Sequence, residues 1–346
     1  MNIFVLVIFL IIVFVFSYLI TCWIRSYALK HGIIDLPCKR SSHTKPTPRG
    51  AGLSVSLIFL FCLILLQIIY PTQWRLWSAL GAGSLIISLV GWLDDRFGLP
   101  RSVRLTAHLV AASWAVFILG GLPTIRTGNG LLELGMLGNA IAVLSIVWFV
   151  NLYNFMDGID GLAAGNAVLV ALAAGGLSAL SGGYYFALIY LILAFAVAGF
   201  LPWNWPPAKV FMGDAGSANI GFLLAVLGIA AENANHLHLL VWFILSEVFI
   251  IDATATLFRR ILIGREWLKA HKSHAYQRAV QIGNSHLAVT VAIMVINIVL
   301  ITAAVYAFYN EKMIIPIAVC TSVAIFAAWV YYAIYRYEYK RTSGDA

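Results

Sequence analysis

The sequence has little charge and no charge-rich tract. Only 10% of its 346 residues are charged, against about 25% in soluble domains, whereas 62% are hydrophobic and the mean hydropathy is +0.92. Ten prolines are too few for a disordered arm. This composition excludes an ordinary soluble protein and predicts a single integral membrane domain over residues 1–346.

Cysteine is also scarce. The four cysteines, Cys22, Cys38, Cys62 and Cys320, form no CxxC pair, and three of them lie in apolar segments. A disulfide framework and a zinc site are therefore not expected. The net charge of +8 is the basic excess that a polytopic protein carries on its cytoplasmic side, and we expect no nucleic-acid partner.

Eleven apolar segments approach the length that spans a lipid bilayer. They cover 2–24, 51–70, 76–93, 104–122, 134–153, 159–180, 183–200, 215–231, 236–258, 287–308 and 312–335. The first lacks a basic n-region and is too long for a signal peptide. The expected fold is an all-α polytopic membrane protein with about eleven transmembrane helices.

The basic residues predict the orientation of these helices. If the connections alternate between sides, nineteen of the 22 Lys and Arg residues fall on one side, and only Arg75, Arg126 and Lys312 fall on the other. The positive-inside rule then places the N-terminus outside and the C-terminus in the cytoplasm. We expect a multi-pass protein of the bacterial inner membrane.

Acidic residues gather on the same predicted cytoplasmic side. They are Asp94, Asp95, Asp157, Asp160 and Asp214, with Asp252 one to two turns inside the ninth span. The outer loops hold only Glu133, Glu232 and Glu311. Acidic groups from separate segments, amid basic loops, are the layout expected of a site for a metal and an anionic substrate at the cytoplasmic face.

The segment 151–165 is the most informative one. Asn151, Asn154, Asp157 and Asp160 recur every three residues between apolar stretches. On a helix such a row curls slowly around the axis, so it presents amides and then carboxylates to one curved site. Gly158 lets the backbone leave the helix. Ionisable groups at membrane depth are costly and usually functional.

Asp94 and Asp95 close the third span. Consecutive helical residues point about 100° apart, so we expect one carboxylate to meet the metal or reacting phosphate and the other to meet a neighbouring group. A solvated helix end is the alternative, although a carboxylate at a helix C-terminus opposes the dipole.

Asp214 precedes Gly216 and Ser217 at the start of the eighth span. It is a candidate Mg²⁺ ligand beside an anion-binding helix N-terminus. A purely structural N-cap is the alternative.

Two basic loops are candidate substrate contacts. Arg259, Arg260, His271 and His274 lie in the longest predicted cytoplasmic loop, where arginine would bind phosphates. Solvated surface histidines are the alternative, and zinc is not expected because further ligands are missing. Lys45 lies in the first basic loop. The alternative is that this loop is basic only because it lies on the cytoplasmic side of the membrane.

In this order and on one face, these elements resemble the polyprenyl-phosphate N-acetylhexosamine-1-phosphate transferases, of the glycosyltransferase family 4 type. The resemblance implies transfer of a sugar 1-phosphate from a UDP-N-acetyl sugar to polyprenyl (undecaprenyl) phosphate, with Mg²⁺, or alternatively Mn²⁺, and release of UMP. The sequence His271–Gln277 is similar to the branch that starts lipopolysaccharide O-antigen chains. A homodimer is one assembly to test.

By motif, the resemblance implies the roles of the candidate residues. Asp94 and Asp95 match the family's catalytic acidic pair. Asp157 and Asp160, together with Asn151 and Asn154, lie in its nucleotide- and metal-proximal segment. Asp214 matches its magnesium ligand, with Asn154 beside it. Lys45, Arg259, Arg260, His271 and His274 match its substrate-binding loops.

Two other functions stay open. A CDP-alcohol phosphotransferase also pairs acids with glycine, but its Asp-Gly-x-x-Ala-Arg pattern is absent, because Asp157 is followed by Gly-Ile-Asp-Gly-Leu. A transporter of an anionic solute predicts polar residues at mid-membrane in repeated halves. The acids instead lie at one face, and no repeat is evident.

Overall fold

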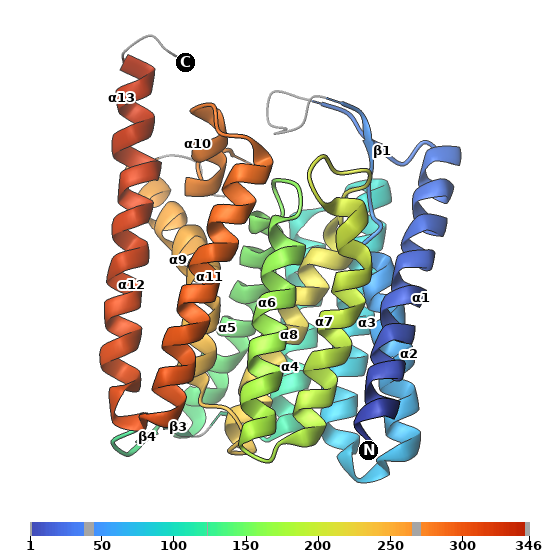
Figure 1. The fold of residues 1–346 in the computed structure, drawn as a ribbon, viewed down its shortest axis with the longest axis vertical. Coiled ribbons are helices and arrows are strands. Elements are labelled where there is room, and N and C mark those ends of the chain that lie inside the picture. Colours follow the sequence, from blue (N-terminus) through green and yellow to red (C-terminus); the bar gives the residue numbers. More distant parts are fainter. Residues whose placement is uncertain (1, 38–44, 123, 265–270, 343–346) are drawn as a thin grey trace.

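The computed structural model describes residues 2–37, 45–122, 124–264 and 271–342. Eleven long helices run side by side along one axis (Figure 1). They are α1 (Ile3–Lys30), α2 (Leu53–Ile69), α3 (Trp74–Phe97), α4 (Arg101–Leu119), α5 (Gly135–Met156), α6 (Leu162–Leu180), α7 (Tyr184–Asn204), α8 (Asp214–Asn233), α9 (Leu239–Leu262), α11 (His286–Tyr309) and α12 (Ile314–Val330).

These eleven helices confirm the predicted all-α polytopic fold. Ten helical stretches are long and apolar enough to cross a membrane, and the remaining one, α2, is an apolar helix of 17 residues, which is still within the spanning range. The first helix extends six residues beyond the predicted limit of 24.

Several short elements were not predicted. A helix, α10 (Ala275–Gln281), precedes α11, and α12 continues through a π-helical turn η3 (Tyr331–Arg336) into α13 (Tyr337–Thr342). The 3-10 turns η1 (Pro71–Gln73) and η2 (Glu311–Met313) precede α3 and α12. The antiparallel strand pairs are β1 (Ile34–Asp35) with β2 (Thr47–Pro48) and β3 (Thr124–Arg126) with β4 (Leu131–Glu133). Strands this short leave no signal in hydropathy.

The two chain termini lie at opposite ends of the bundle, as Figure 1 shows. This agrees with an odd number of crossings. We call the end where α3 stops and α8 starts the site end; it is at the top of Figure 1. Arg75, Arg126 and Lys312 belong to elements at the opposite end. That the site end faces the cytoplasm stays a prediction.

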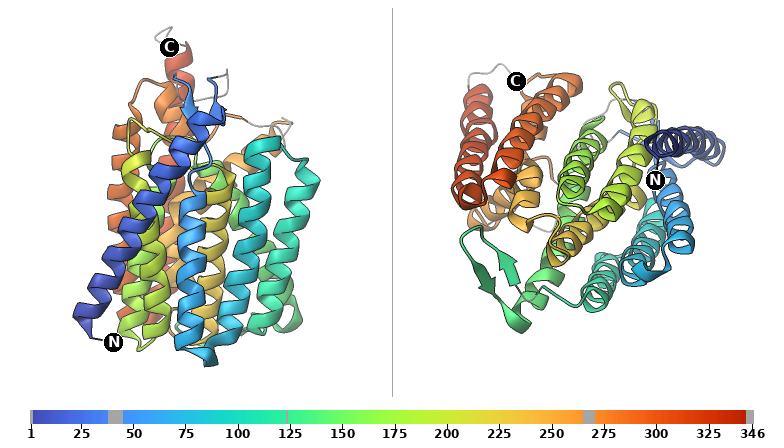
Figure 2. Two further views of the ribbon diagram at one scale, coloured as in Figure 1. Left: turned by 90° about the vertical axis from the view of Figure 1, so that its right-hand side faces the viewer. Right: turned by 60° about the horizontal axis from the view of Figure 1, so that its bottom comes forward.

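Helix α8 forms the core of the bundle, and nearly all of its residues are buried. It lies among other helices when the bundle is seen from its end, with α1 and α12 at opposite edges (Figure 2). Glycine permits this packing. A Cβ on Gly52, before α2, would lie 2.6 Å from the Cα of Gly216, so the two backbones touch at the site end.

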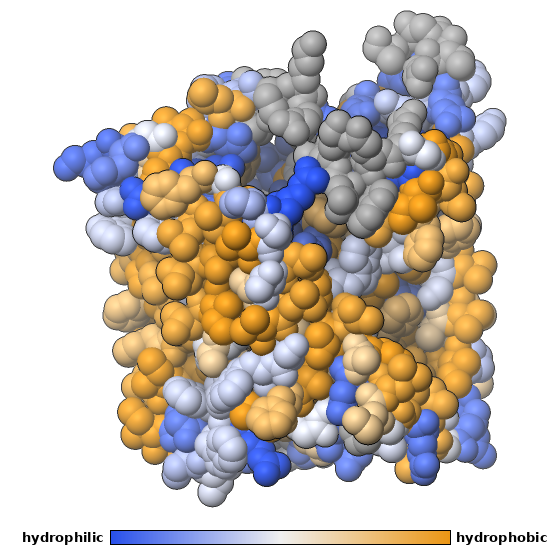
Figure 3. Space-filling view, turned by 180° about the vertical axis from the view of Figure 1, so that it is seen from behind, coloured by the Kyte–Doolittle hydropathy of each residue, from blue (hydrophilic) through white to orange (hydrophobic). Residues whose placement is uncertain are grey.

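The outer surface matches a membrane environment. A hydrophobic band covers the middle of the bundle, and hydrophilic residues gather toward both ends (Figure 3). Large apolar side chains on the outermost helices are exposed, among them Ile3 and Phe4 of α1 and Val323 of α12. A soluble protein rarely exposes so much contiguous apolar surface.

Candidate active site

A polar cavity of about 240 Å³ lies at the site end; we call it the acid pocket. Its wall comes from the β1–β2 segment, the ends of α3 and α5, the loops before α6 and α8, and the starts of α10 and α11. The lining residues are Asp35, Arg49, Asp95, Asn154, Asp157, Gly158, Ile159, Asp160, Asn204, Phe211, Gly213, Asp214, Gln277 and His286. Five carboxylates therefore face one guanidinium.

Asp95 joins α3 to the start of α8. Its carboxylate accepts hydrogen bonds from the backbone N–H groups of Asp214 (3.1 Å) and Ala215 (3.3 Å), and it pairs with Arg49 Nη2 at 3.0 Å. Gly213 between them has φ +74°, and a Cβ there would collide with this carboxylate. Asp95 therefore caps α8, so the alternative that Asp214 is the cap is wrong.

Asp94 does not line the acid pocket but lies behind Asp214. Its oxygens accept from Leu99 N and from Arg104 Nη1, both at 2.7 Å. The same Arg104 nitrogen lies 3.1 Å from Asp214 Oδ2. The two adjacent acids thus separate as helical geometry requires: Asp95 lines the cavity, and Asp94 contacts its wall at Asp214, both directly and through Arg104.

Asp157 follows the end of α5, which stops at Met156. The polar row of 151–160 therefore does not continue as one helix, and that part of the prediction is wrong. Among the described residues, none donates a hydrogen bond to the Asp157 side chain. Burial, together with the negative charges of Asp214, Asp95 and Asp160, raises its pKa well above the usual range of an aspartate. This carboxylate is the one most in need of a cation.

Asp160 has protein partners instead. Its Oδ2 accepts from Ala208 N at 3.0 Å, and its Oδ1 lies 3.3 Å from His286 Nδ1. Its carbonyl accepts from Thr290 Oγ1 at 2.9 Å. Asp160 lines the acid pocket, but its bonds brace the loop before α8 against α11.

The two asparagines of α5 diverge. Asn154 lines the acid pocket, donates to Ser217 Oγ at 3.0 Å and hydrogen-bonds Asp214. Asn151 donates to the carbonyl of Val147 at 2.7 Å and lines only a small neighbouring cavity. Of the pair, only Asn154 can touch a ligand of the acid pocket.

The histidines of the long loop lie behind α10, not in the acid pocket. His274 caps α10 and lies 3.4 Å from Asp252 Oδ1, and His271 stacks on it with ring centroids 5.1 Å apart. Burial and the neighbouring positive charges of His274 and Arg260 lower the pKa of His271 to about 4. The segment is not helical between them, and His274 is buried, so the alternative of solvated surface histidines is wrong for His274.

The other basic candidates are also outside the cavity. Arg259 pairs with Glu338 at 3.1 Å, and Arg260 is buried. Lys45 is exposed, and it follows residues 38–44, which lie outside the described residues. The structure therefore unites Asp95, Asn154, Asp157, Asp160 and Asp214, but not the predicted substrate-binding side chains Lys45, Arg259, Arg260, His271 and His274.

Several lining or bridging residues were missed, among them Asp35, Arg49, Arg104 and His286. Arg49 stood in a loop that had attracted attention for its overall charge, and Arg104 had been counted only as a positive-inside residue. His286 begins a span. In these three cases the signal was a charged or polar side chain within a few residues of a helix start.

The residue types of the acid pocket fit a hard divalent cation that is held partly by the protein and partly by the phosphates of a bound substrate. Among the described residues, no three acidic, histidine or cysteine side chains form a complete metal-binding group. Mg²⁺ commonly takes one or two carboxylates and completes its shell with water and substrate phosphates. Asp157, without a donor, and Asp214, beside Asn154, are suited to that arrangement.

Known proteins are similar to this chain over most of its length. A family described as Glycosyl transferase family 4 matches residues 77–232. The chain is 32% identical to a decaprenyl-phosphate N-acetylglucosaminephosphotransferase of Mycolicibacterium smegmatis, over 90% of this chain and 85% of that protein. It is 33% identical to a protein of the same name from Mycobacterium tuberculosis, over 86% and 81%. It is 29% identical to an undecaprenyl-phosphate alpha-N-acetylglucosaminyl 1-phosphate transferase of Yersinia pestis, over 79% and 76%.

Proposed function

Because the chain belongs to glycosyl transferase family 4, we propose that it transfers an N-acetylhexosamine 1-phosphate from a UDP-sugar to polyprenyl phosphate. The reaction takes place at the cytoplasmic face of the membrane and releases UMP. The product starts an O-antigen chain or a related cell-envelope glycan. N-acetylglucosamine is the first sugar to test, because it stands in the names of the relatives.

The observation that carries this proposal is the acid pocket itself. Five carboxylates, among them Asp157 without a donor in the described part of the chain, border a cavity at one end of a membrane bundle. A diphosphate could not enter such a cavity alone, since like charges repel. A divalent cation bound with the diphosphate removes this objection. The position at a bundle end also lets a water-soluble donor meet a lipid acceptor.

The reaction joins two anions. An oxygen of the lipid phosphate attacks the β-phosphorus of the UDP-sugar, the bond from that phosphorus to the bridging oxygen breaks, and UMP leaves with this oxygen. Positioning and charge neutralisation dominate such transfers. Mg²⁺, held by Asp214 and Asp157 with Asn154 alongside, would supply neutralisation of the diphosphate.

The protein's own residues do the positioning. Arg49, paired with Asp95, offers a guanidinium at the cavity wall for a phosphate oxygen. Arg104 ties Asp94 to Asp214 and so fixes the direction of the proposed metal ligand. Asp160 holds the loop before α8 in place through Ala208. Asp94 is thus a positioning residue.

The test uses purified protein in detergent with undecaprenyl phosphate, Mg²⁺ and UDP-N-acetylglucosamine, UDP-N-acetylgalactosamine or UDP-glucose. We expect UMP and a labelled lipid from one N-acetyl sugar, and neither product after chelation of the metal. Asp214→Asn is the variant, and Glu133→Gln, at the opposite end, is its control. Uptake of labelled sugar into proteoliposomes without UMP would replace the proposal with transport.

A further inference from the structure

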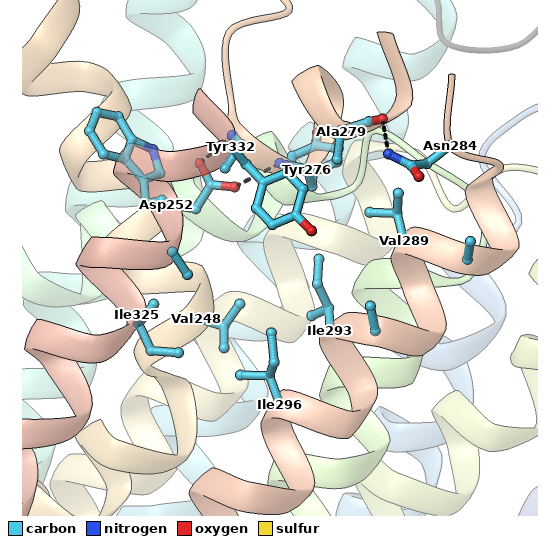
Figure 4. Close-up of a pocket in the computed structure, with 15 residues that line it drawn as sticks. Val248, Asp252, Tyr276, Ala279, Asn284, Val289, Ile293, Ile296, Ile325 and Tyr332 are labelled. Atoms are coloured by element: carbon cyan, nitrogen blue, oxygen red, sulfur yellow. Dashed lines mark hydrogen bonds between the residues drawn. The ribbon is translucent and has the colours of Figure 1, made fainter. Parts of the chain in front are cut away.

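A second cavity, of about 220 Å³, lies between α9, α11 and α12 and is closed at the site end by α10 (Figure 4). We call it the lateral slot. Its residues are Val248, Asp252, Ala275, Tyr276, Ala279, Asn284, Ala288, Val289, Ala292, Ile293, Ile296, Ile325, Ala328, Trp329 and Tyr332.

The lateral slot is apolar along the membrane and polar only at its upper end. Val248, Ile293, Ile296 and Ile325 line its depth, as Figure 4 shows. On α11 the lining runs from Ala288 to Ile296, which at a rise of 1.5 Å per residue is about 12 Å. The shape suits one hydrocarbon chain that enters from the bilayer.

Three polar side chains at the upper end, Asp252, Tyr276 and Asn284, already have partners. Asp252 accepts from Ala275 N at 2.9 Å and from Tyr276 N at 3.3 Å. The Tyr276 hydroxyl donates to the carbonyl of Phe155 at 2.7 Å, and Asn284 Nδ2 donates to that of Ala279 at 2.7 Å. These bonds fix the roof of the slot, so its occupant is held by apolar contact.

The lateral slot and the acid pocket are separate. They share no lining residue, and α10 stands between them with Tyr276 on the slot and Gln277 on the acid pocket. A lipid whose chain fills the slot would therefore not deliver its headgroup into the acid pocket. This geometry favours a bilayer phospholipid over the proposed acceptor.

Cationic side chains lie near the mouth, on α10, η3 and α13. The guanidinium of Arg278 lies 4.3 Å from the ring of Tyr337 and donates to the carbonyl of Ala333 in the π-helical turn. Lys340 Nζ donates to the carbonyl of Ile282 at 2.5 Å, and Arg336 is exposed. Such groups at a membrane surface attract anionic lipid headgroups.

We propose that the lateral slot binds one acyl chain of an anionic bilayer phospholipid, with its headgroup beside Arg336 and Lys340. The bound chain supports α10 from below. Since α10 carries Gln277 into the acid pocket, occupancy of the slot also supports catalysis; this second part rests on the proposed function.

The binding test needs no turnover. The protein is placed in phosphatidylcholine vesicles with a trace of phosphatidylglycerol that carries a diazirine in its acyl chain, and cross-linked peptides are mapped. Cross-links are expected on α11 and α12 at residues that line the slot. Unlabelled phosphatidylglycerol should compete. Stronger competition by undecaprenyl phosphate, or cross-links spread evenly over the lipid-facing helices, would overturn the proposal.

A matched pair of variants tests the slot. Ala328 lines it, whereas the neighbouring exposed Ala327 does not. Ala328→Phe should lower slot cross-linking by about tenfold, because the ring fills the space of the chain, while Ala327→Phe should leave it unchanged. Ala292→Leu is a milder filler if Ala328→Phe does not fold. Equal labelling of all variants would refute the assignment.

The headgroup contacts have their own control. Arg336→Gln with Lys340→Gln should abolish the preference for phosphatidylglycerol over diazirine-phosphatidylcholine, whereas Lys312→Gln at the opposite end should not. UMP release in vesicles with and without phosphatidylglycerol then measures the coupling to catalysis. If phosphatidylglycerol does not change UMP release although cross-linking in the slot is intact, the coupling to catalysis is rejected and only the lipid site stands.

Discussion

The conversion of Asp94 to asparagine distinguishes positioning from general-base catalysis. Asp94 lies behind the acid pocket, with Arg104 Nη1 and Leu99 N each at 2.7 Å from its oxygens. Asparagine can still accept from Leu99, but it cannot hold the charge of Arg104. Hydrogen bonds to charged groups contribute about 1.5–3 kcal/mol, which corresponds to a rate loss of about 10- to 150-fold if Arg104 no longer orients Asp214.

The dependence of the variant's rate on pH distinguishes the two roles of Asp94. A phosphate monoester has a second pKa near 6, so the acceptor is about 97% dianionic at pH 7.5 and needs no base to remove its proton. We expect Asp94→Asn to stay impaired from pH 6 to pH 9, in single-turnover measurements of UMP release. Recovery toward the wild-type rate as the pH rises would refute positioning and restore Asp94 as the base.

A double-mutant cycle sharpens the same argument. If Asp94 acts through Arg104, the combination of Asp94→Asn and Arg104→Gln should cost little more than the larger single loss. If the two residues contributed independently, the fold losses of rate in the two single variants would instead multiply. Membrane content and thermal stability of each variant serve as controls, since both residues also connect α3 to α4.

Three further outcomes are expected. A reporter fused after Ala346 should be active only in the cytoplasm and one inserted near Asn129 only outside; the reverse would overturn the orientation. Asp214→Asn should remove most activity with normal membrane insertion, and excess Mg²⁺ should restore part of it, whereas a near-wild-type rate would show that Asp214 is no metal ligand. Gly213→Ala should reduce UMP release by about tenfold or more, because a Cβ at φ +74° meets the Asp95 carboxylate; an unchanged rate would contradict this constraint.

The eleven spans and the positions of the acidic motifs could be predicted from the sequence. Hydropathy is a local property, and a segment of about twenty apolar residues has few alternatives to a membrane helix. Acids such as Asp157 and Asp214 stood out for the same reason, because a carboxylate beside apolar sequence is costly unless it has a function.

Only the tertiary structure decided what each of these residues faces. Asp94 and Asp95 are adjacent in sequence, but the rotation of the helix sends one to Arg104 and the other to the acid pocket. His271 and His274 were expected among the residues that bind the substrate. They instead precede α10 and do not line the acid pocket. Such pairings join residues far apart in the chain, such as Arg49 with Asp95, and they depend on how the helices pack. A single sequence carries its own hydropathy, but not the contacts that packing creates.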